Sequence, residues 1–365
     1  MTSYDEAVTD ALSKQRLINI ARAHHHQPIH FTDVSNIAAT FDFRVSASAT
    51  SALTGEASRA LMPVFGGSVA ENPTISIVPI EGEEFTKRLL TPFQETKFTL
   101  LLQQRSDIDL LLRLMAQELR ITVNGQEVSY RNTPADWAGC EMFRRVVTHL
   151  SAIQDQNQLY AEPIISDRTW TIPANSVTAE GFQALQKEYL VAYNQKDNSY
   201  ILRKQITGHI LITNYDPDTL SPDERARLID ETEQGTVNDV SFDIRPGHIG
   251  GEYLIKGDFR LRSFNTILNF LCCSLEEDPE SHVEKDRRTP AFHENPVNTM
   301  ELVLSGGTPS EADLSIKSHG KCYAVNTTGP LVRWNREASQ LPYLLFQMTV
   351  TEVPRVGVPS ITIAK

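Results

Sequence analysis

The residues best suited to chemistry form one cluster of histidines near the start of the chain. His24, His25 and His26 are consecutive, and His30 follows four positions after the last of them. Imidazole side chains at such close spacing can bind zinc or copper. No cysteine or carboxylate stands nearby in a ligand pattern, and histidine is also favourable at the C-terminal end of a helix, where it interacts with the helix dipole. We therefore interpret the cluster as structural and predict no metal site.

Other residues that often carry catalysis occur without a catalytic arrangement. The four cysteines are Cys140, Cys272, Cys273 and Cys322. They lack the CxxC spacing of a zinc site, and we interpret them as buried thiols. The glycine-rich segments at residues 247 to 251 and 305 to 308 match neither a phosphate-binding loop nor the dinucleotide fingerprint, and the chain lacks the G-x-S-x-G and HExxH motifs of hydrolases. We predict no catalytic residue and no cofactor.

The clearest pattern is a strict alternation of apolar and polar residues from position 36 to position 50. A period of two indicates a long β-strand with one apolar side, and about 3.3 Å per residue gives it a length of roughly 45 to 50 Å. Asp42 and Arg44 belong to the polar face. The apolar positions are Ile37, Ala39, Phe41, Phe43, Val45, Ala47 and Ala49.

Two environments would explain this strand. In a soluble antiparallel sheet the apolar face covers a protein core, and one-sided alternation is common there. In a membrane hairpin the apolar face contacts lipid, whereas Asp42 and Arg44 face a wet lumen. Two strands cannot close a barrel, so the membrane reading requires several subunits that each contribute a hairpin. Residues 51 to 60 would form the tip, and a less regular return limb would follow to about residue 80.

Composition excludes some classes of function. Thirty-four Lys and Arg against 46 Asp and Glu give a net charge of −12, which argues against nucleic acid as a partner. No segment approaches the roughly 18 consecutive apolar residues of a membrane helix. The first residues lack the basic start and apolar stretch of a signal peptide, so we expect a soluble chain or one that has lost its targeting segment.

The predicted helices and strands alternate without a regular βαβ order, which indicates an α+β fold. A length of 365 residues favours two mixed helix and strand domains. We place the N-terminal domain at residues 1–165, including the extended hairpin at 31–80, and the C-terminal domain at 175–365. Residues 106 to 119 are predicted to be helical, and the polar, proline-containing segment 276 to 296 is expected to be a mobile loop.

Three groups of segments carry a resemblance to a known set of proteins. They are residues 17 to 22 followed by Pro28, Phe31 and residues 34 to 35; residues 74 to 79 followed by 83 to 85 and 110 to 115; and residues 323 to 325 followed by 344 to 346. In this order the chain resembles a set of uncharacterised bacterial envelope proteins, many of them made as lipoproteins. The resemblance implies an exported protein whose signal segment and lipid-bearing cysteine have been removed, and it implies no activity.

These observations predict a non-enzymatic protein of the bacterial cell envelope, in the periplasm or at the outer membrane. It would be a homo-oligomer that uses the hairpin at residues 31–80 for assembly or for membrane insertion, as a pore or scaffold does. The alternative is a soluble, cytoplasmic enzyme or small-ligand binding protein with a site between the two domains. Detergent-dependent oligomerisation would favour the first interpretation, and a deep pocket with convergent polar side chains would favour the second.

Overall fold

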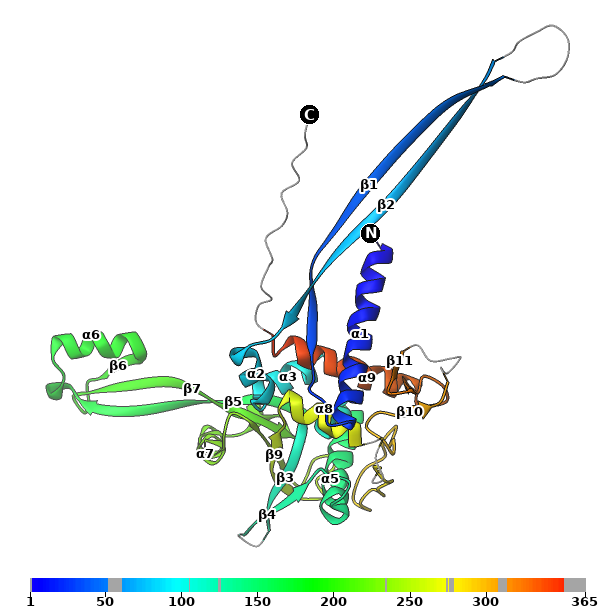
Figure 1. Ribbon diagram of the computed structural model, residues 1–365. Helices are drawn as coiled ribbons and strands as arrows, with labels where there is room; N and C mark the ends of the chain where they lie inside the picture. The colour runs from blue at the N-terminus through cyan, green and yellow to red at the C-terminus, as the bar shows by residue number, and fades with distance from the viewer. Residues whose placement is uncertain are drawn as a thin grey trace.

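The structure is an α+β fold with a long two-stranded ribbon near its N-terminus, as predicted (Figure 1). Residues 2–5, 7, 33–51, 61–78 and 123 are described by their backbone alone. The structure, a computed structural model, describes residues 2–51, 61–104, 106–123, 126–233, 235–273, 275, 279–307 and 314–350.

The ribbon consists of β1 (Phe31–Ser51) and β2 (Leu61–Ile80). The two strands pair antiparallel along their length as a two-stranded sheet, beginning with Phe31 opposite Ile80. Figure 1 shows them leaving the rest of the chain together. The predicted strand at 36 to 50 and its return limb are therefore confirmed as strands. The predicted tip at residues 51–60 lies outside the described residues, except for Ser51, which ends β1.

The base of the ribbon is anchored in the body, by which we mean the rest of the described chain. The Phe31 side chain is 1% exposed, and its ring stacks on that of Phe346 with 4.2 Å between the centroids. The helix α1 (Thr2–His24) precedes β1, and its buried Asn19 side chain pairs with the backbone of His30 through N–O distances of 2.8 and 3.0 Å. Aromatic packing and one amide thus fix the direction in which the ribbon leaves the body.

A seven-stranded sheet lies at the centre of the body. Its order is β4-β3-β9-β8-β7-β5, with β6 also paired to β7, and every pair is antiparallel except β7 with β8. Its members are β3 (Ala116–Val123), β4 (Gln126–Arg131), β5 (Tyr160–Pro173), β6 (Leu190–Asn194), β7 (Ser199–Thr213), β8 (Asp239–Ile244) and β9 (Ile255–Leu261). The ranges 1–165 and 175–365 share this sheet, and β5 runs through the gap between them, so the division into two domains stays a prediction.

Helices surround this sheet and contribute to one large hydrophobic cluster that runs from Ile20 to Phe346. The helix predicted at 106 to 119 ends at Met115, because the chain passes directly into β3 at Ala116. The helices after the ribbon are α2 (Glu83–Leu90), α3 (Glu95–Gln103), α4 (Ile108–Met115), α5 (Trp137–Asp155), α6 (Ala179–Glu188), α7 (Pro222–Thr232), α8 (Phe264–Cys273) and α9 (Val332–Gln347), with short 3-10 turns at Ala174–Ser176 and Pro217–Thr219.

A small three-stranded sheet packs beside α1 and α9. It contains β10 (Leu302–Ser305), β11 (Ser315–Ser318) and β12 (Lys321–Val325), with β12 in the middle. Its buried Tyr323 side chain packs against Leu17 of α1 in a separate cluster. The small sheet thereby supports the helix that precedes the ribbon.

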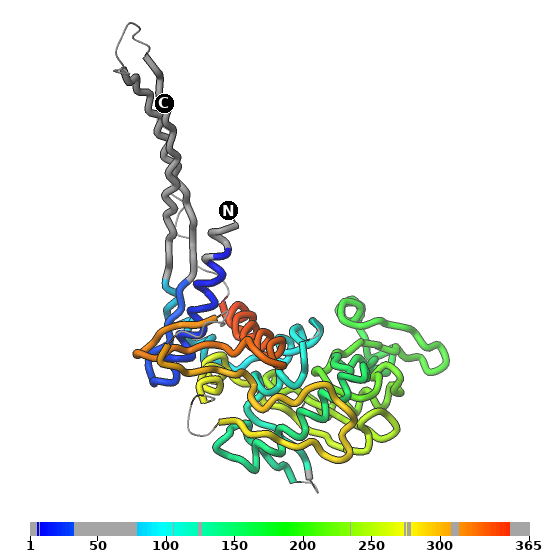
Figure 2. Tube along the Cα trace, turned by 90° about the vertical axis from the view of Figure 1, so that its right-hand side faces the viewer, coloured from blue at the N-terminus to red at the C-terminus, as the bar shows by residue number. Residues whose placement is uncertain are grey.

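A second projection, which we call the arm (residues 165–207), is formed by the outer parts of β5 and β7 together with β6 and α6. Figures 1 and 2 show the arm (green) leaving the body on the side away from α1 (blue). The arm has its own side-chain contacts, including ring pairs of Trp170 with Tyr189 at 5.5 Å and Phe182 with Tyr200 at 5.0 Å. Its base packs on α7 through a separate hydrophobic cluster that includes Ile229.

Candidate functional site

The seven apolar positions of the predicted strand all lie in β1. Asp42 lies opposite Ala70, and Arg44 lies opposite Ser68. Residues directly opposite in an antiparallel pair share a face, so the apolar face of β1 continues onto β2 with one charged interruption at position 71. What this face contacts stays a prediction. The apolar pairs are Ile37 opposite Ile75, Ala39 opposite Pro73, Phe41 opposite Glu71, Phe43 opposite Val69, Val45 opposite Gly67, Ala47 opposite Phe65 and Ala49 opposite Pro63.

The histidine cluster lies where α1 ends against the small sheet. The His25 Nε2 atom is 2.8 Å from the Tyr323 hydroxyl, and the His25 ring is 4.4 Å from the ring of His319. Burial, followed by the nearby charge of His319, lowers the pKa of His25 and favours its neutral form. Within the described part of the chain, no group of three or more His, Cys, Asp or Glu side chains is arranged to hold a metal ion.

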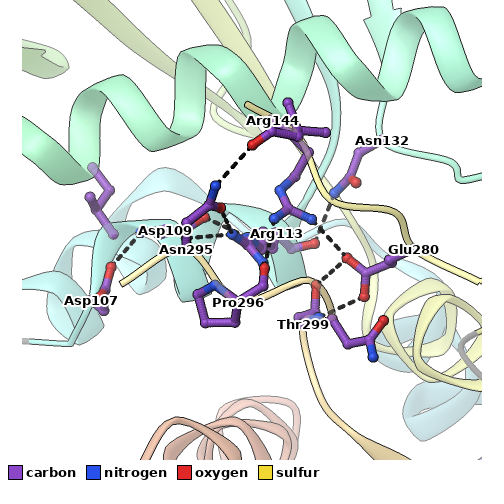
Figure 3. Close-up of polar contacts among 12 residues, drawn as sticks. Asp107, Asp109, Arg113, Asn132, Arg144, Glu280, Asn295, Pro296 and Thr299 are labelled. Carbon is purple, nitrogen blue, oxygen red and sulfur yellow. Dashed lines mark hydrogen bonds and ion pairs between the residues drawn. The ribbon is translucent and has the colours of Figure 1, made fainter. Parts of the chain in front are cut away.

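Five buried charged residues form a set that we call the arginine network: Asp109, Arg113, Arg144, Arg262 and Glu280. Figure 3 labels all of them except Arg262. The Arg113 side chain is fully buried and donates two hydrogen bonds to Asp109, from Nε to Oδ1 at 2.5 Å and from Nη2 to Oδ2 at 2.6 Å. Its Nη1 donates to the Pro296 carbonyl at 2.7 Å. The residue spacing of four places both ends of this ion pair on one face of α4.

The second ion pair of the network fastens the irregular segment 279–301 to α5. Arg144 Nη1 is 3.2 Å from a Glu280 oxygen and also donates to the Val297 carbonyl, while Nη2 donates to Pro296 at 3.0 Å. Glu280 accepts from the amide and hydroxyl of Thr299 at 2.6 and 2.8 Å. Burial lowers the pKa of Arg144 to about 10, so the guanidinium stays charged at neutral pH. Side chains rather than a strand ladder hold this segment in place.

The third guanidinium of the network, that of Arg262, closes the C-terminal end of α4. Its Nη1 donates to the carbonyls of Arg113 and Leu114 at 2.7 and 3.0 Å, and its Nη2 donates to the Asn132 carbonyl at 2.6 Å. Carbonyls at a helix end carry a partial negative charge, which a guanidinium stabilises. Among the described residues no carboxylate forms an ion pair with Arg262, so the network holds three cations and two anions.

A cavity of about 580 Å³ lies between α4, α5 and α9. Asp107, which caps α4 through the Asp109 amide at 2.8 Å, lines it together with Asp155, His293 and Trp334. Burial, followed by the nearby Asp109 carboxylate, raises the pKa of Asp107 to about 6. The lining comes from both ranges of the predicted domain division, as a site between two domains requires.

A buried histidine, His149, is held by neutral partners. Its Nε2 lies 3.0 Å from the Gly250 carbonyl and its Nδ1 lies 3.1 Å from the Thr289 hydroxyl. A carbonyl only accepts, so Nε2 donates and Nδ1 accepts from Thr289. Burial lowers the pKa of His149 to about 4. This side chain connects α5 to two loops and is 0% exposed, which indicates a packing role.

The sequence analysis did not identify the arginine network. Arg113 lies inside the apolar stripe of α4. A charged residue at such a position indicates that it has a buried partner, and this was the signal in the sequence. Glu280 belongs to the segment that was expected to be a mobile loop; its described part is irregular, as predicted, but the side chains of Glu280, Val283 and Thr289 are buried. Arg113 binds the Pro296 carbonyl and Arg144 binds Glu280, and both contacts depend on tertiary structure.

The described helices include none with the length and apolar character needed to cross a membrane. The chain matched no protein-family model, no curated protein and no solved structure. Function is therefore inferred from the residues and from their geometry.

Proposed function

We propose that this chain is a non-enzymatic subunit of the bacterial cell envelope that assembles with further copies of itself through the ribbon β1–β2. The observation that carries this proposal is the pairing of β1 with β2 along 20 or more residues as a sheet of two strands. The resemblance of the sequence to bacterial envelope proteins supports the compartment, in the periplasm or at the outer membrane.

A ribbon of this kind needs a partner for physical reasons. Each of its strands spans about 65 to 70 Å at 3.3 Å per residue, and isolated two-stranded sheets are at best marginally stable in water. Each strand has one neighbour among the described residues, so each presents a second edge of backbone donors and acceptors. A copy of the same ribbon could pair with these edges, and repeated pairing would produce a ring or a barrel.

Insertion into the outer membrane is one form that such an assembly would take. Lipid tolerates no unpaired strand edge, so one copy could not insert its ribbon alone. A closed barrel built from several ribbons would place one face toward lipid and the other toward water, as the alternation between residues 36 and 50 requires. Membrane insertion therefore depends on oligomerisation in this proposal.

The test is to remove the ribbon while keeping its base. Deleting residues 36–76 and joining the ends with a short flexible linker should leave a folded body, because Phe31 and the large cluster stay in place. We expect near-native far-UV circular dichroism and a cooperative melt, together with loss of the oligomer seen by sedimentation in detergent. A matched control deletes residues 174–198 of the arm, between the paired Pro173 and Ser199, and should keep the oligomer.

Two results would contradict the proposal. One is a full-length protein that stays monomeric at high concentration, in detergent and with lipid vesicles. The other is an oligomer that survives the ribbon deletion unchanged.

A ligand-binding role is the second candidate, and the cavity of about 580 Å³ favours it. A screen of small metabolites by thermal shift would test this role. Binding that is lost in Trp334→Ala, but kept in Trp170→Ala on the arm, would support it, since Trp334 lines the cavity and Trp170 does not.

A further inference from the structure

A second cavity, of about 380 Å³, lies where β3 and the end of β4 meet α8. Arg262, Asn132 and Thr266 line it, with Arg131 and Thr133 from the chain at the end of β4. Its lining is therefore rich in hydrogen-bond donors. Arg262 belongs to the arginine network and is 3% exposed.

The Arg262 guanidinium has donors left over. It carries five N–H groups, and three of these are used by the carbonyls of Arg113, Leu114 and Asn132. Its Nε has no acceptor among the described residues. In the neighbouring Arg113, Nε and Nη2 bind both oxygens of the Asp109 carboxylate. Arg113 therefore shows that the Nε–Nη2 edge of a buried guanidinium in this protein binds a carboxylate where one is present.

The orientation of Arg262 is fixed without an anion. Its guanidinium carbon lies 3.9 Å from the centre of the Phe270 ring, its Nη1 atom is held at the end of α4 and its Nη2 atom is held by the Asn132 carbonyl. Burial lowers the pKa of Arg262 to about 9, which leaves the group charged at neutral pH. A planar, charged and prepositioned donor group is the usual anchor of carboxylate and phosphate sites.

The other charges at the cavity favour an anion as well. Arg131 is exposed at its rim and forms no ion pair within the described chain. Glu118 is the carboxylate of the lining, and its oxygen lies 3.7 Å from Arg120, which partly neutralises it. The local balance at the cavity is positive, although the whole chain carries a net charge of −12.

We propose that the cavity between β3, β4 and α8 binds a small oxyanion, a phosphate or carboxylate group, which accepts hydrogen bonds from Arg262 at its base and from Arg131 at its rim. Thr133 and Thr266 line the same space, whereas the Asn132 amide donates to the carbonyls of Arg113 and Ala116. This site is independent of the ribbon and adds a ligand to a chain whose proposed role is assembly.

The test uses inorganic phosphate and acetate as probes for the full-length protein. Isothermal titration calorimetry at constant ionic strength, balanced with sodium chloride, should show saturable binding of at least one probe. Tighter binding of phosphate would identify the ligand group as phosphoryl, and tighter binding of acetate would identify it as carboxylate. Arg131→Gln should weaken this binding about ten-fold, since it removes a charged donor from an exposed position. Arg203→Gln removes an exposed strand arginine from the arm and should leave binding unchanged.

A second variant tests the base of the cavity. Arg262→Lys keeps the charge but loses the Nε donor, and we expect binding to fall below detection while circular dichroism shows a folded protein. If this variant fails to fold, the Arg131→Gln and Thr266→Val variants still decide the question. Three results would overturn the proposal: no saturable binding of either probe to the unmodified protein, equal weakening by Arg203→Gln, or unchanged affinity in both Arg131→Gln and Thr266→Val.

Discussion

The ribbon and the body differ in how completely their polar groups are paired within the chain. In the body the buried Arg113 and Arg144 bind the carboxylates of Asp109 and Glu280, and the buried Arg262 donates to three backbone carbonyls. In the ribbon each long strand pairs with one other strand among the described residues. This difference supports a body that folds by itself. It also supports a ribbon whose outer backbone groups form hydrogen bonds with another copy of the chain.

The arm shows what a projection needs in order to be self-supporting. It has a third strand, β6, and a helix, α6, as well as aromatic pairs such as Phe182 with Tyr200. Its exposed large hydrophobic side chains are those of Ile165, Trp170, Leu190 and Tyr193. The described residues give the ribbon neither a third strand nor a covering helix, so it has no such local support.

Breaking an ion pair of the body gives the largest effect we expect. Arg113→Leu would leave the Asp109 carboxylate buried without its partner, which costs about 3 to 5 kcal/mol of the free energy of unfolding. Urea unfolding followed by circular dichroism measures this cost. The double variant Asp109→Leu with Arg113→Leu should recover much of it, because no unpaired charge remains. A single variant as stable as the unmodified protein would show that the body does not depend on this pairing.

Placing charge on the two faces of β1 tests the ribbon. Lysine at Phe41 or Phe43 should weaken assembly more than lysine at Thr40 or Ser46, by about 2 to 4 kcal/mol, because only the first pair belongs to the apolar face. Sedimentation of each variant over a range of concentrations gives the difference. Equal effects on both faces would refute the one-sided ribbon.

The pH dependence of stability tests the body further, because the buried His149 and the half-buried Asp107 titrate in opposite senses. The pKa of His149 is lowered to about 4 from 6.5, so the unfolded chain binds the proton first and stability falls as the pH decreases from 6.5 toward 4. The pKa of Asp107 is raised to about 6 from 3.8, so the folded chain binds the proton first and stability rises as the pH decreases from 6 toward 3.8.

Removing the Asp107 carboxyl should make visible the pH dependence of stability that comes from His149. Asp107→Asn keeps a residue that caps helices well but removes the stabilising proton uptake, so its stability should fall between pH 6.5 and pH 4 by about 2 kcal/mol more than that of the unmodified protein. Thermal melts at several pH values measure the difference. Asp197→Asn on the exposed arm is the control and should follow the unmodified protein; a shared slope for all three proteins would refute the assignment.

The smallest effect is expected at the base of the ribbon. Replacing His24, His25 and His26 together should change the free energy of unfolding by no more than about 1 to 2 kcal/mol, through effects at the end of α1. Chemical denaturation measures this change. Stoichiometric metal in protein purified without an affinity tag, lost in the triple variant, would show that the cluster is a metal site.

Local patterns predicted much of the secondary structure. The alternation from 36 to 50 became β1, and Ser221 with Glu224 forms the capping box that opens α7. The helix predicted through Leu119 was too long, because the apolar stripe that begins in α4 continues into β3 and buried helices and buried strands share that composition.

Long-range partners were not predictable in the same way. Arg144 and Glu280 are far apart in the sequence, and neither carries a local motif. Polar groups of the segment around Glu280 form buried hydrogen bonds, including one from Arg144. Composition alone cannot distinguish such polar residues from polar residues that face water. The cavity beside Arg262 depends on the same tertiary contacts.

The pairing of β3 with β9 has a consequence for the order of folding during synthesis. Leu119 lies opposite Phe259, so the central sheet cannot close until Phe259 has left the ribosome. The ribbon, in contrast, is a local hairpin whose last residue is Ile80, and it can form much earlier. Nascent chains that are translated side by side on one messenger therefore present their ribbons to one another before either chain has a body.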